Sequence, residues 1–282
     1  MKLCRYGKPG YEKPGMIDGE GKLRDLSKIV DSLGPNEISP RGLKMLTRLK
    51  PESLPLVNGT PRYGVPYVGI GKFVAIGLNY SDHAKEAGLP IPPEPIVFMK
   101  ATTCISGPND DVIQPKNSTK LDWEVELGVV IGTTARYVDE ASALNHVAGY
   151  CIVNDVSERS FQMATSQWDK GKGFDTAGPI GPWLVTTDEI RDPQALDMAL
   201  EVNEKRMQSG NTRTMVFNVV KLISHVSQYM TLLPGDIICT GTPPGVGLGV
   251  KPNPVFLKPG DVMRLTISGL GEQKQRVVAY SA

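Results

Sequence analysis

The sequence predicts an α+β protein that is mainly β: a mixed, largely antiparallel sandwich or roll, preceded by a small N-terminal domain. Two observations support this fold class. Many short β-like runs follow one another between residues 72 and 280, and few long helical patterns interrupt them. The 30 glycines and 23 prolines supply many turns. Strands and helices do not alternate regularly, so the chain does not read as a βαβ repeat.

Residues 1–66 form the predicted small domain and its connector. Short strands are expected at 1–6 and 14–18, followed by a helix over 39–49 with Ser39 as N-cap and Pro40 at its first position. The connector, 51–66, holds four prolines and the turn pair Asn58-Gly59. We therefore place the main domain at 67–282.

The main domain contains the β-like runs and one clear helix. The helix is predicted over 218–233, where apolar residues recur with a period of 3.6. The predicted strands lie at 72–77, 96–100, 121–132, 150–156, 197–203, 236–241, 262–267 and 275–280.

Composition and charge exclude several classes of protein. The 31 basic and 30 acidic side chains nearly balance, so the chain has no electrostatic case for binding nucleic acid or an anionic membrane. It shows neither the apolar segment of a signal peptide nor a run as long as a membrane span, and we expect a cytoplasmic protein. The scattered Cys4, Cys104, Cys151 and Cys239 suit a reducing compartment, and we interpret Cys151 and Cys239 as core residues.

The stretch 119–132, TKLDWEVELGVVIG, places three acidic residues two apart in a predicted strand. Alternation sends Asp122, Glu124 and Glu126 to one face. On this stretch alone, an ordinary half-buried strand with a charged exterior is the favoured interpretation over a functional site. Glu124 and Glu126 lie about 6–7 Å apart at their Cα atoms, which lets both side chains reach one cation.

A second acidic signal follows the apolar run 150–153, where Asp155 closes a predicted buried strand. Asp155 is either an N-cap for the next segment or a third ligand beside Glu124 and Glu126. Three carboxylates form an all-oxygen set that suits Mg²⁺, Mn²⁺ or Ca²⁺ and not zinc. A divalent cation would also remove the cost of burying them together.

The stretch AIGLNYSDHAKEAGLP predicts a brief helix over 82–87, with Ser81 as N-cap and a stop at Gly88. His83 and Glu86 then share a face. Glu86 can fix one nitrogen of His83 and leave the other as a general base. The alternative is an exposed helix whose histidine is merely polar. His146 and His225 have no comparable setting.

Two glycine-rich stretches complete the set of candidates. Residues 167–182 carry Lys170 and Lys172, and residues 236–249 run from a strand into a loop that lacks the spacing of a phosphate-binding loop. The second is either a structural turn or a loop that offers Thr242 and backbone N–H groups to an oxyanion.

Five motifs in this order resemble those of the fumarylacetoacetate hydrolase family: GLNYSDHAKE, DWEVELGVVIG, NDVSERSFQ, GKGFDT and TGTPPGVG. The likeness extends from about Gly71 to the C-terminus, and the N-terminal stretch resembles the short leader domain of bacterial members. It implies a mixed β-sandwich roll, usually homodimeric, with Mg²⁺ or Mn²⁺ on Glu124, Glu126 and Asp155, and Ca²⁺ as a substitute. Gly173 departs from the pattern, since many relatives have Ser there, and we expect a more mobile loop around Lys172.

The resemblance also assigns roles to the remaining candidates. It implies a catalytic dyad of His83 and Glu86 on a mobile lid, and a catalytic Lys172. The substrate contacts that it implies are Tyr80, Arg159, Gln162 and Thr242.

This ligand set suggests chemistry on a 2-oxo acid, the expected small-molecule partner. A cation acting as a Lewis acid stabilises the enolate formed when a bond at C3 breaks. We expect a hydrolase that cuts the C3–C4 bond of a 2,4-dioxo acid, such as a 2,4-diketo-3-deoxy sugar acid, and releases pyruvate. The alternatives are a ureidoglycolate-type lyase, an isomerase, an oxaloacetate decarboxylase and a non-catalytic oxo-acid binding protein.

Overall fold

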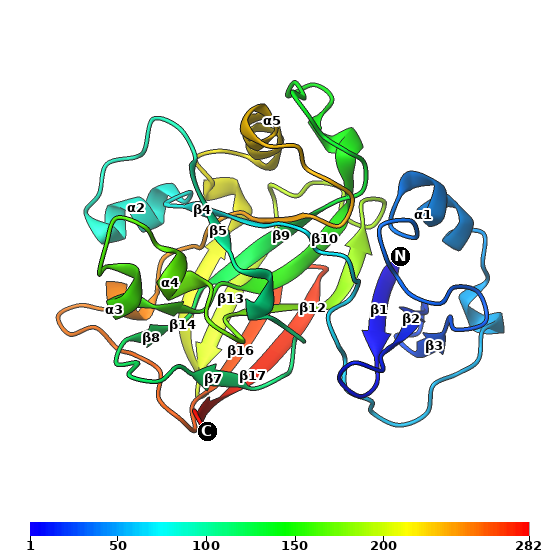
Figure 1. The fold of residues 1–282 in the computed structure, drawn as a ribbon, viewed down its shortest axis with the longest axis horizontal. Coiled ribbons are helices and arrows are strands. Elements are labelled where there is room, and N and C mark those ends of the chain that lie inside the picture. Colours follow the sequence, from blue (N-terminus) through cyan, green and yellow to red (C-terminus); the bar gives the residue numbers. More distant parts are fainter. Residues whose placement is uncertain (282) are drawn as a thin grey trace.

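The computed structural model describes residues 1–281 and shows two main β-sheets with few helices (Figure 1). The large sheet crosses most of the molecule, and β6 (Ile105–Ser106) pairs with its strand β12. Its strands, in spatial order, are β3 (Leu23–Asp25), β2 (Lys13–Ile17), β1 (Lys2–Tyr6), β12 (Gly178–Thr186), β10 (Val147–Asn154), β9 (Val125–Ile131), β15 (Ile237–Cys239), β4 (Phe73–Gly77) and β5 (Ile96–Lys100).

The second sheet packs against the first and is antiparallel except at its last strand. Its order is β14 (Lys205–Asn211), β13 (Asp197–Val202), β16 (Val262–Ile267), β17 (Gly271–Ala279) and β7 (Val112–Gln114). A two-stranded ladder joins β8 (Leu121–Asp122) to β11 (Ser157–Glu158). The mainly β class with mixed sheets is therefore confirmed.

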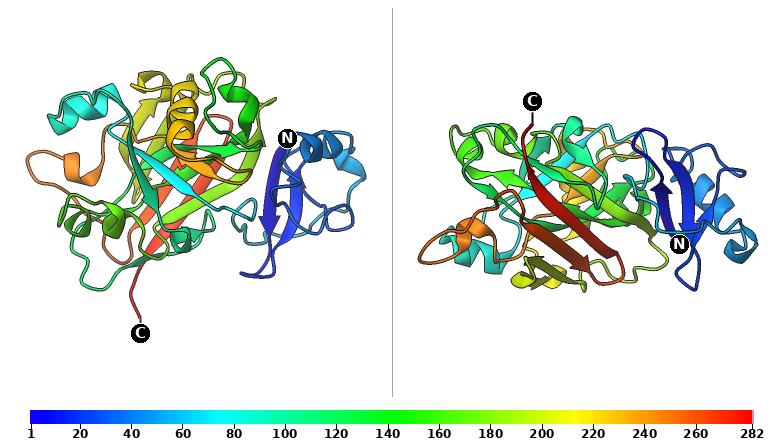
Figure 2. Two further views of the ribbon diagram at one scale, coloured as in Figure 1. Left: turned by 45° about the horizontal axis from the view of Figure 1, so that its top comes forward. Right: turned by 90° about the horizontal axis from the view of Figure 1, so that it is seen from below.

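Helices are short and lie outside the sheets (Figures 1 and 2). The α-helices are α1 (Pro40–Leu46), α2 (Ser81–Ala87), α3 (Arg159–Gln162), α4 (Asp169–Lys172) and α5 (Val219–Tyr229). The 3₁₀ turns are η1 (Pro51–Ser53), η2 (Thr102–Cys104), η3 (Ala143–His146), η4 (Thr212–Thr214) and η5 (Gly247–Gly249). In residues 1–281, no helix combines the length and the apolar character that crossing a bilayer requires.

The N-terminal strands and α1 form a lobe at one end of the molecule (Figure 2). Ser39 caps α1 as expected, accepting from the backbone N–H of Gly42 at 3.1 Å. The lobe is joined to the rest through β1, which pairs with β12. The large sheet thus contains strands from both sides of residue 66. The division into two domains at that point stays a prediction.

The predicted strand over 121–132 is divided in two by Trp123 and Glu124. β8 pairs with β11, whereas β9 pairs with β10 and β15, so the two halves have different partners. Every residue from Leu121 to Gly132 is buried. The half-buried strand with a charged exterior is therefore wrong, because Arg159, Lys172 and the glycine-rich loop cover the carboxylate face that was expected to meet solvent.

Two strands fall in stretches where the sequence analysis predicts no strand. β12 contains Pro179 and Pro182 among its glycines, yet it lies between β1 and β10 and buries Ile180, Leu184 and Val185. β14 has almost no apolar alternation and is held by its pairing with β13. All four cysteines are buried and free, as the core interpretation of Cys151 and Cys239 requires.

Candidate active site

Three buried carboxylates converge where β9 and β10 meet. Glu124 precedes β9, Glu126 lies within it, and Asp155 follows the paired strand β10. One oxygen from each lies within 4.8 Å of the others. Glu124 is 5% exposed, Glu126 2% and Asp155 0%. The predicted ligand set is therefore brought together, and Asp155 does not act as the cap of α3, a position that Glu158 occupies.

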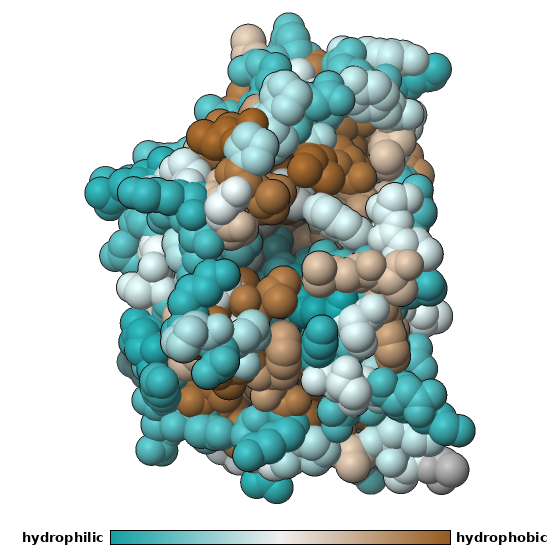
Figure 3. Space-filling model, turned by 90° about the vertical axis from the view of Figure 1, so that its left-hand side faces the viewer, coloured by the Kyte–Doolittle hydropathy of each residue, from teal (hydrophilic) through white to brown (hydrophobic). Residues whose placement is uncertain are grey.

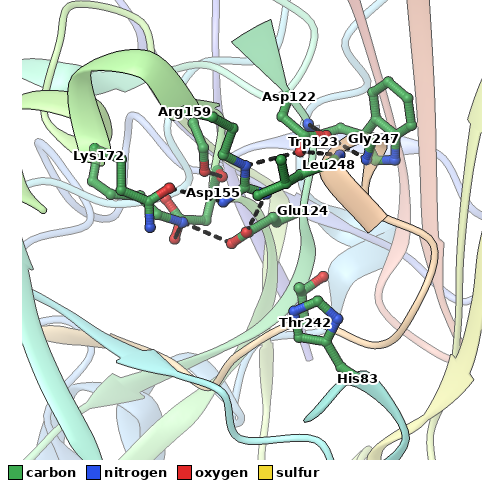
Figure 4. Close-up of polar contacts among 12 residues, drawn as sticks. His83, Asp122, Trp123, Glu124, Asp155, Arg159, Lys172, Thr242, Gly247 and Leu248 are labelled. Atoms are coloured by element: carbon green, nitrogen blue, oxygen red, sulfur yellow. Dashed lines mark hydrogen bonds and ion pairs between the residues drawn. The ribbon is translucent and has the colours of Figure 1, made fainter. Parts of the chain in front are cut away.

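Three buried basic side chains contact the carboxylates, and Figure 4 shows two of them, Lys172 and Arg159. The Nζ atom of Lys172 donates to Glu124 Oε2 at 2.8 Å and to Asp155 Oδ2 at 2.7 Å. Lys100 Nζ donates to Asp155 Oδ1 at 2.6 Å and also to the backbone carbonyl of Lys172. Arg159 Nη2 donates to Glu124 Oε1 at 2.7 Å. Sequence patterns did not reveal Lys100, whose only signal is a lysine ending an apolar strand.

Among the three carboxylates, Glu126 is the one that forms no ion pair within residues 1–281. Within the described residues it accepts a hydrogen bond from the backbone N–H of Gly241 at 2.7 Å. Burial, followed by repulsion from Asp155 and Glu124, raises its pKa well above the usual range. Burial would also raise the pKa of Glu124, but Lys172 and Arg159 outweigh it and hold that pKa below the usual range.

The donor set fits a hard divalent cation. Three carboxylates lie within reach of one point, and the charge of Glu126 is not compensated by a basic partner among residues 1–281. A bound cation would stabilise the ionised form of Glu126 and relieve the repulsion from its neighbours. Oxygen-only ligands favour Mg²⁺, Mn²⁺ or Ca²⁺ over softer metals.

Asp122 lies outside this cluster and makes different contacts from Glu124 and Glu126. One oxygen accepts from Arg159 Nε at 2.8 Å, and both accept from the glycine-rich loop, through the N–H of Gly247 at 2.6 Å and of Leu248 at 3.0 Å. The strand break at Trp123 separates it from Glu124 and Glu126. Asp122 therefore orients Arg159 and fixes the loop.

His83 and Glu86 lie on α2, which follows β4. His83 Nδ1 is 3.0 Å from Glu86 Oε2, the distance expected of the predicted dyad. Glu86 also accepts from the N–H of Gly245 at 3.0 Å, which ties α2 to the glycine-rich loop. Burial would raise the pKa of Glu86, but hydrogen bonds from His83 and Gly245 lower it. The helix begins at Ser81 with Tyr80 at the N-cap, one residue earlier than expected, and ends at Gly88 in the left-handed conformation.

The dyad and two of the three carboxylates, Glu124 and Glu126, line one cavity of about 540 Å³. Its polar walls come from α2, β9, the glycine-rich loop and the two short helices α3 and α4. Figure 4 shows His83 and Lys172 approaching from different sides of Glu124. The polar lining residues are His83, Glu86, Glu124, Glu126, Arg159, Gln162, Lys172, Thr242 and Lys251.

Three of the four predicted substrate contacts line the cavity, and one does not. Arg159, Gln162 and Thr242 line the cavity, and Arg159 Nη1 donates to Gln162 Oε1 at 3.0 Å. Tyr80 does not line it: its side chain is fully buried and its hydroxyl donates to Met198 Sδ at 3.0 Å. The roles of all these residues stay predictions.

Close packing of α3 and α4 brings Lys172 beside Arg159. A Cβ atom on Gly171 would lie only 2.4 Å from the backbone nitrogen of Gln162, so only glycine allows this approach. The N–H of Gly173 donates to the carbonyl of Asp169 at 2.7 Å and ends α4. The expected mobility of this loop stays a prediction.

Fold and site together define a mainly β protein with a buried cluster of three carboxylates beside a cavity, a cluster that could hold a cation. The model of the fumarylacetoacetate hydrolase C-terminal domain matches residues 72–278, and the chain belongs to the fumarylacetoacetate hydrolase family. The resemblance seen in the five motifs is thereby confirmed.

Three similar proteins indicate the range of this family. The chain is 62% identical over 98% of both chains to a protein of Burkholderia ambifaria, which is named as a hydrolase with no substrate given. The structure of a probable 2-hydroxyhepta-2,4-diene-1,7-dioate isomerase from Mycobacterium abscessus has a TM-score of 0.84 and 33% identity, with full coverage of both chains. Maleylpyruvate hydrolase from Sphingobium sp. SYK-6, in complex with manganese(II) and pyruvate, has a TM-score of 0.82 and 29% identity, also over both full chains. The family thus includes hydrolases and isomerases that act on small molecules.

Proposed function

We propose that this protein is a metal-dependent hydrolase that cleaves the C3–C4 bond of a 2,4-dioxo acid and releases pyruvate. One observation carries the proposal: the His83–Glu86 dyad lines the same cavity as Glu124, Glu126 and Lys172, with Asp155 close behind the two glutamates. Binding alone would require a cation site but no oriented base. Similarity to a hydrolase bound to manganese and pyruvate supports both the cation and the product.

The cation site of the proposal is Glu124, Glu126 and Asp155, occupied by Mg²⁺ or Mn²⁺. A cation bound there would supply Lewis-acid stabilisation for the negative charge of an enolate. Arg159 and Lys172 together hold Glu124 in place, since Arg159 donates to one oxygen of that carboxylate and Lys172 donates to the other.

His83 is the proposed general base. Its Nδ1 faces Glu86, which leaves Nε2 to take a proton from water as that water attacks C4. Lys172, whose pKa is raised by Asp155 and Glu124 against the lowering effect of burial, stays charged and stabilises the oxyanion that forms at C4. The C3–C4 bond then breaks, C3 gains a proton, and pyruvate and a second acid leave.

The experiment is product analysis on acetylpyruvate, a simple 2,4-dioxo acid. Protein loaded with Mn²⁺ should form pyruvate and acetate in equal amounts, and His83→Ala should form neither at a comparable rate. The variant Tyr229→Ala, which alters an exposed ring on α5, is the control. Failure of the wild-type protein to release pyruvate from any 2,4-dioxo acid would overturn the proposal.

An isomerase is the second candidate, because a solved isomerase is similar over the whole chain. Isomerisation moves a proton without adding water, so the two reactions separate by product. Exchange of C3 deuterium without pyruvate formation would favour the isomerase. The sugar-acid substrate, the homodimer and the cytoplasmic location stay predictions from the sequence.

A further inference from the structure

The cavity has two chemically different halves. Its inner half holds the buried Glu124, Glu126 and Lys172, whereas its more exposed lining residues are mostly apolar, with Gln162 and Lys251 as polar exceptions. Met163, which follows α3, is 69% exposed, and Leu89, which follows α2, is 50% exposed, so both lie near the mouth. Figure 3 shows the hollow on this side of the molecule with hydrophobic residues around it.

An aromatic wall connects the two halves. The ring centroid of Phe98 on β5 lies 5.4 Å from Lys172 Nζ, and the ring of Trp168 meets Phe98 edge to face with centroids 5.3 Å apart. Gly77 at the end of β4 makes room for Trp168, because a Cβ atom there would lie 2.6 Å from the indole ring. The wall therefore starts at the lysine and leads outward to Trp168.

This wall determines what lies next to C4 of a substrate, provided that the proposed function holds. If Lys172 stabilises the oxyanion on C4, the substituent on C4 begins within reach of Phe98. With the 2-oxo acid end at the carboxylate cluster, this substituent extends away from it toward the outer lining residues, which include Trp168 and Met163. A polyhydroxylated substituent would lose its hydrogen bonds to water against such a wall, whereas an alkyl or aryl group would gain from burial.

We propose that the outer half of the cavity is an apolar subsite, walled by Phe98, Trp168 and Met163, that selects 2,4-dioxo acids with an alkyl or aryl group on C4. The inference rests on the proposed function and gives its substrate class. It differs from the sugar acid expected from the sequence. Burial of about 0.8 kcal/mol per methylene corresponds to about a fourfold gain in affinity for each one that reaches the wall.

The test measures binding, so it does not depend on turnover. Four 2-oxo acids that lack the C4 carbonyl, and so cannot be cleaved, are titrated into the Mn²⁺-loaded protein by calorimetry. They are 2-oxobutanoate, 2-oxo-4-phenylbutanoate, a 2-oxo-3-deoxy sugar acid and 2-oxoadipate. We expect the phenyl compound to bind at least about tenfold tighter than 2-oxobutanoate, and the other two to bind within about threefold of it.

Two variants assign the preference to the wall. Trp168→Ala should lower the preference for the phenyl compound at least about threefold and leave the affinity for 2-oxobutanoate unchanged. Met163→Gln should lower it as well, and since that side chain is largely exposed, this variant carries no folding cost. Tyr229→Ala, an exposed aromatic residue outside the cavity, should keep the wild-type preference.

Several results would overturn the apolar subsite. These are equal binding of the four acids, a preference for the hydroxylated or dicarboxylic acid, and a preference that both wall variants retain. A dicarboxylic preference would assign the outer half to Lys251 instead. Cleavage of dioxo acids without any apolar preference would overturn this inference alone, whereas an apolar preference without cleavage would overturn only the proposed reaction. Failure of all four acids to bind would overturn both.

Discussion

Lys100 Nζ and Asp155 Oδ1 form an ion pair 2.6 Å long in which both side chains are almost completely buried. Replacing Lys100 by Met should leave that oxygen without its partner and destabilise the metal-free protein by about 3–5 kcal/mol. Added Mn²⁺ should recover more stability in this variant than in the wild type, because a bound cation offsets the uncompensated charge. Chemical unfolding with and without Mn²⁺ measures both effects.

A surface ion pair provides the matched control for that variant. Lys221 and Glu140 lie 3.1 Å apart with about half of each side chain exposed, so Lys221→Met should change stability by no more than about 1 kcal/mol. Equal stabilities of the Lys100→Met and Lys221→Met proteins would contradict the structural importance of the buried pair.

Glu126→Gln should weaken cation binding without destabilising the fold. The amide resembles the protonated acid that the raised pKa of Glu126 favours in the absence of a cation, so the metal-free protein should unfold like the wild type. Mn²⁺ should bind at least about tenfold more weakly, and its stabilising effect should fall accordingly. Thermal unfolding over a Mn²⁺ titration measures this, and unchanged Mn²⁺ affinity would show that Glu126 is not a ligand.

Replacing a residue of the His83–Glu86 dyad should lower turnover more than it weakens binding. We expect His83→Ala to lower kcat for a 2,4-dioxo acid by about 10²–10⁴ while oxalate binds as in the wild type. Glu86→Gln should cost less, because the base remains and only its orientation suffers, and Lys172→Met should resemble His83→Ala. Hydrolysis by His83→Ala at the wild-type rate would refute the assignment of the base.

The segment around α2 should become more ordered when an oxo acid binds. It is attached through Glu86 to Gly245 and through Asp82 to Thr214, while Leu89 and Ile91 beyond it are 50% and 55% exposed. Few buried contacts place a segment at the low end of local stability. Amide hydrogen exchange over residues 80–90 should slow with saturating oxalate, and identical exchange in both states would argue against a lid.

Asp18 should contribute a pH-dependent part of the stability of the N-terminal lobe. Backbone hydrogen bonds from Lys22 and Glu20 and the side chain of Arg24 at 2.7 Å lower its pKa. Because the pKa is lower in the folded state than the unfolded value of about 3.9, the stabilisation is complete above that value. It is lost as the pH falls through the folded pKa. The stability difference between wild type and Asp18→Asn should therefore be full at pH 7 and shrink below about pH 4; a constant difference would contradict it.

Local patterns predicted the parts of the site that are close in sequence. Two carboxylates two apart in a strand, and a histidine three residues before a glutamate in a helix, fix their own geometry through backbone periodicity. Glu124, Glu126, His83 and Glu86 were accessible to this reasoning. Asp155 was a candidate from its place at the end of a predicted buried strand, and the five motifs added the role of Lys172.

The parts that sequence patterns missed depend on long-range packing. Lys100 meets Asp155 only because β4 and β5 lie at the end of the large sheet next to α4, and no local pattern encodes that meeting. Asp122 separates from Glu124 because β8 and β9 have different partners. β12 reads as a loop from its glycines and prolines, and tertiary pairing with β1 and β10 overrides those preferences.

The pairing of β1 with β12 also has a consequence for biosynthesis. Lys2 pairs with Val185, so during synthesis β1 must wait for more than 180 further residues before its neighbour β12 exists. Meanwhile β1 and β2 can form only a hairpin with an open edge, and such edges invite association between nascent chains. The arrival of residues 178–186 therefore covers the open edge of an early hairpin, well before β15 completes the large sheet.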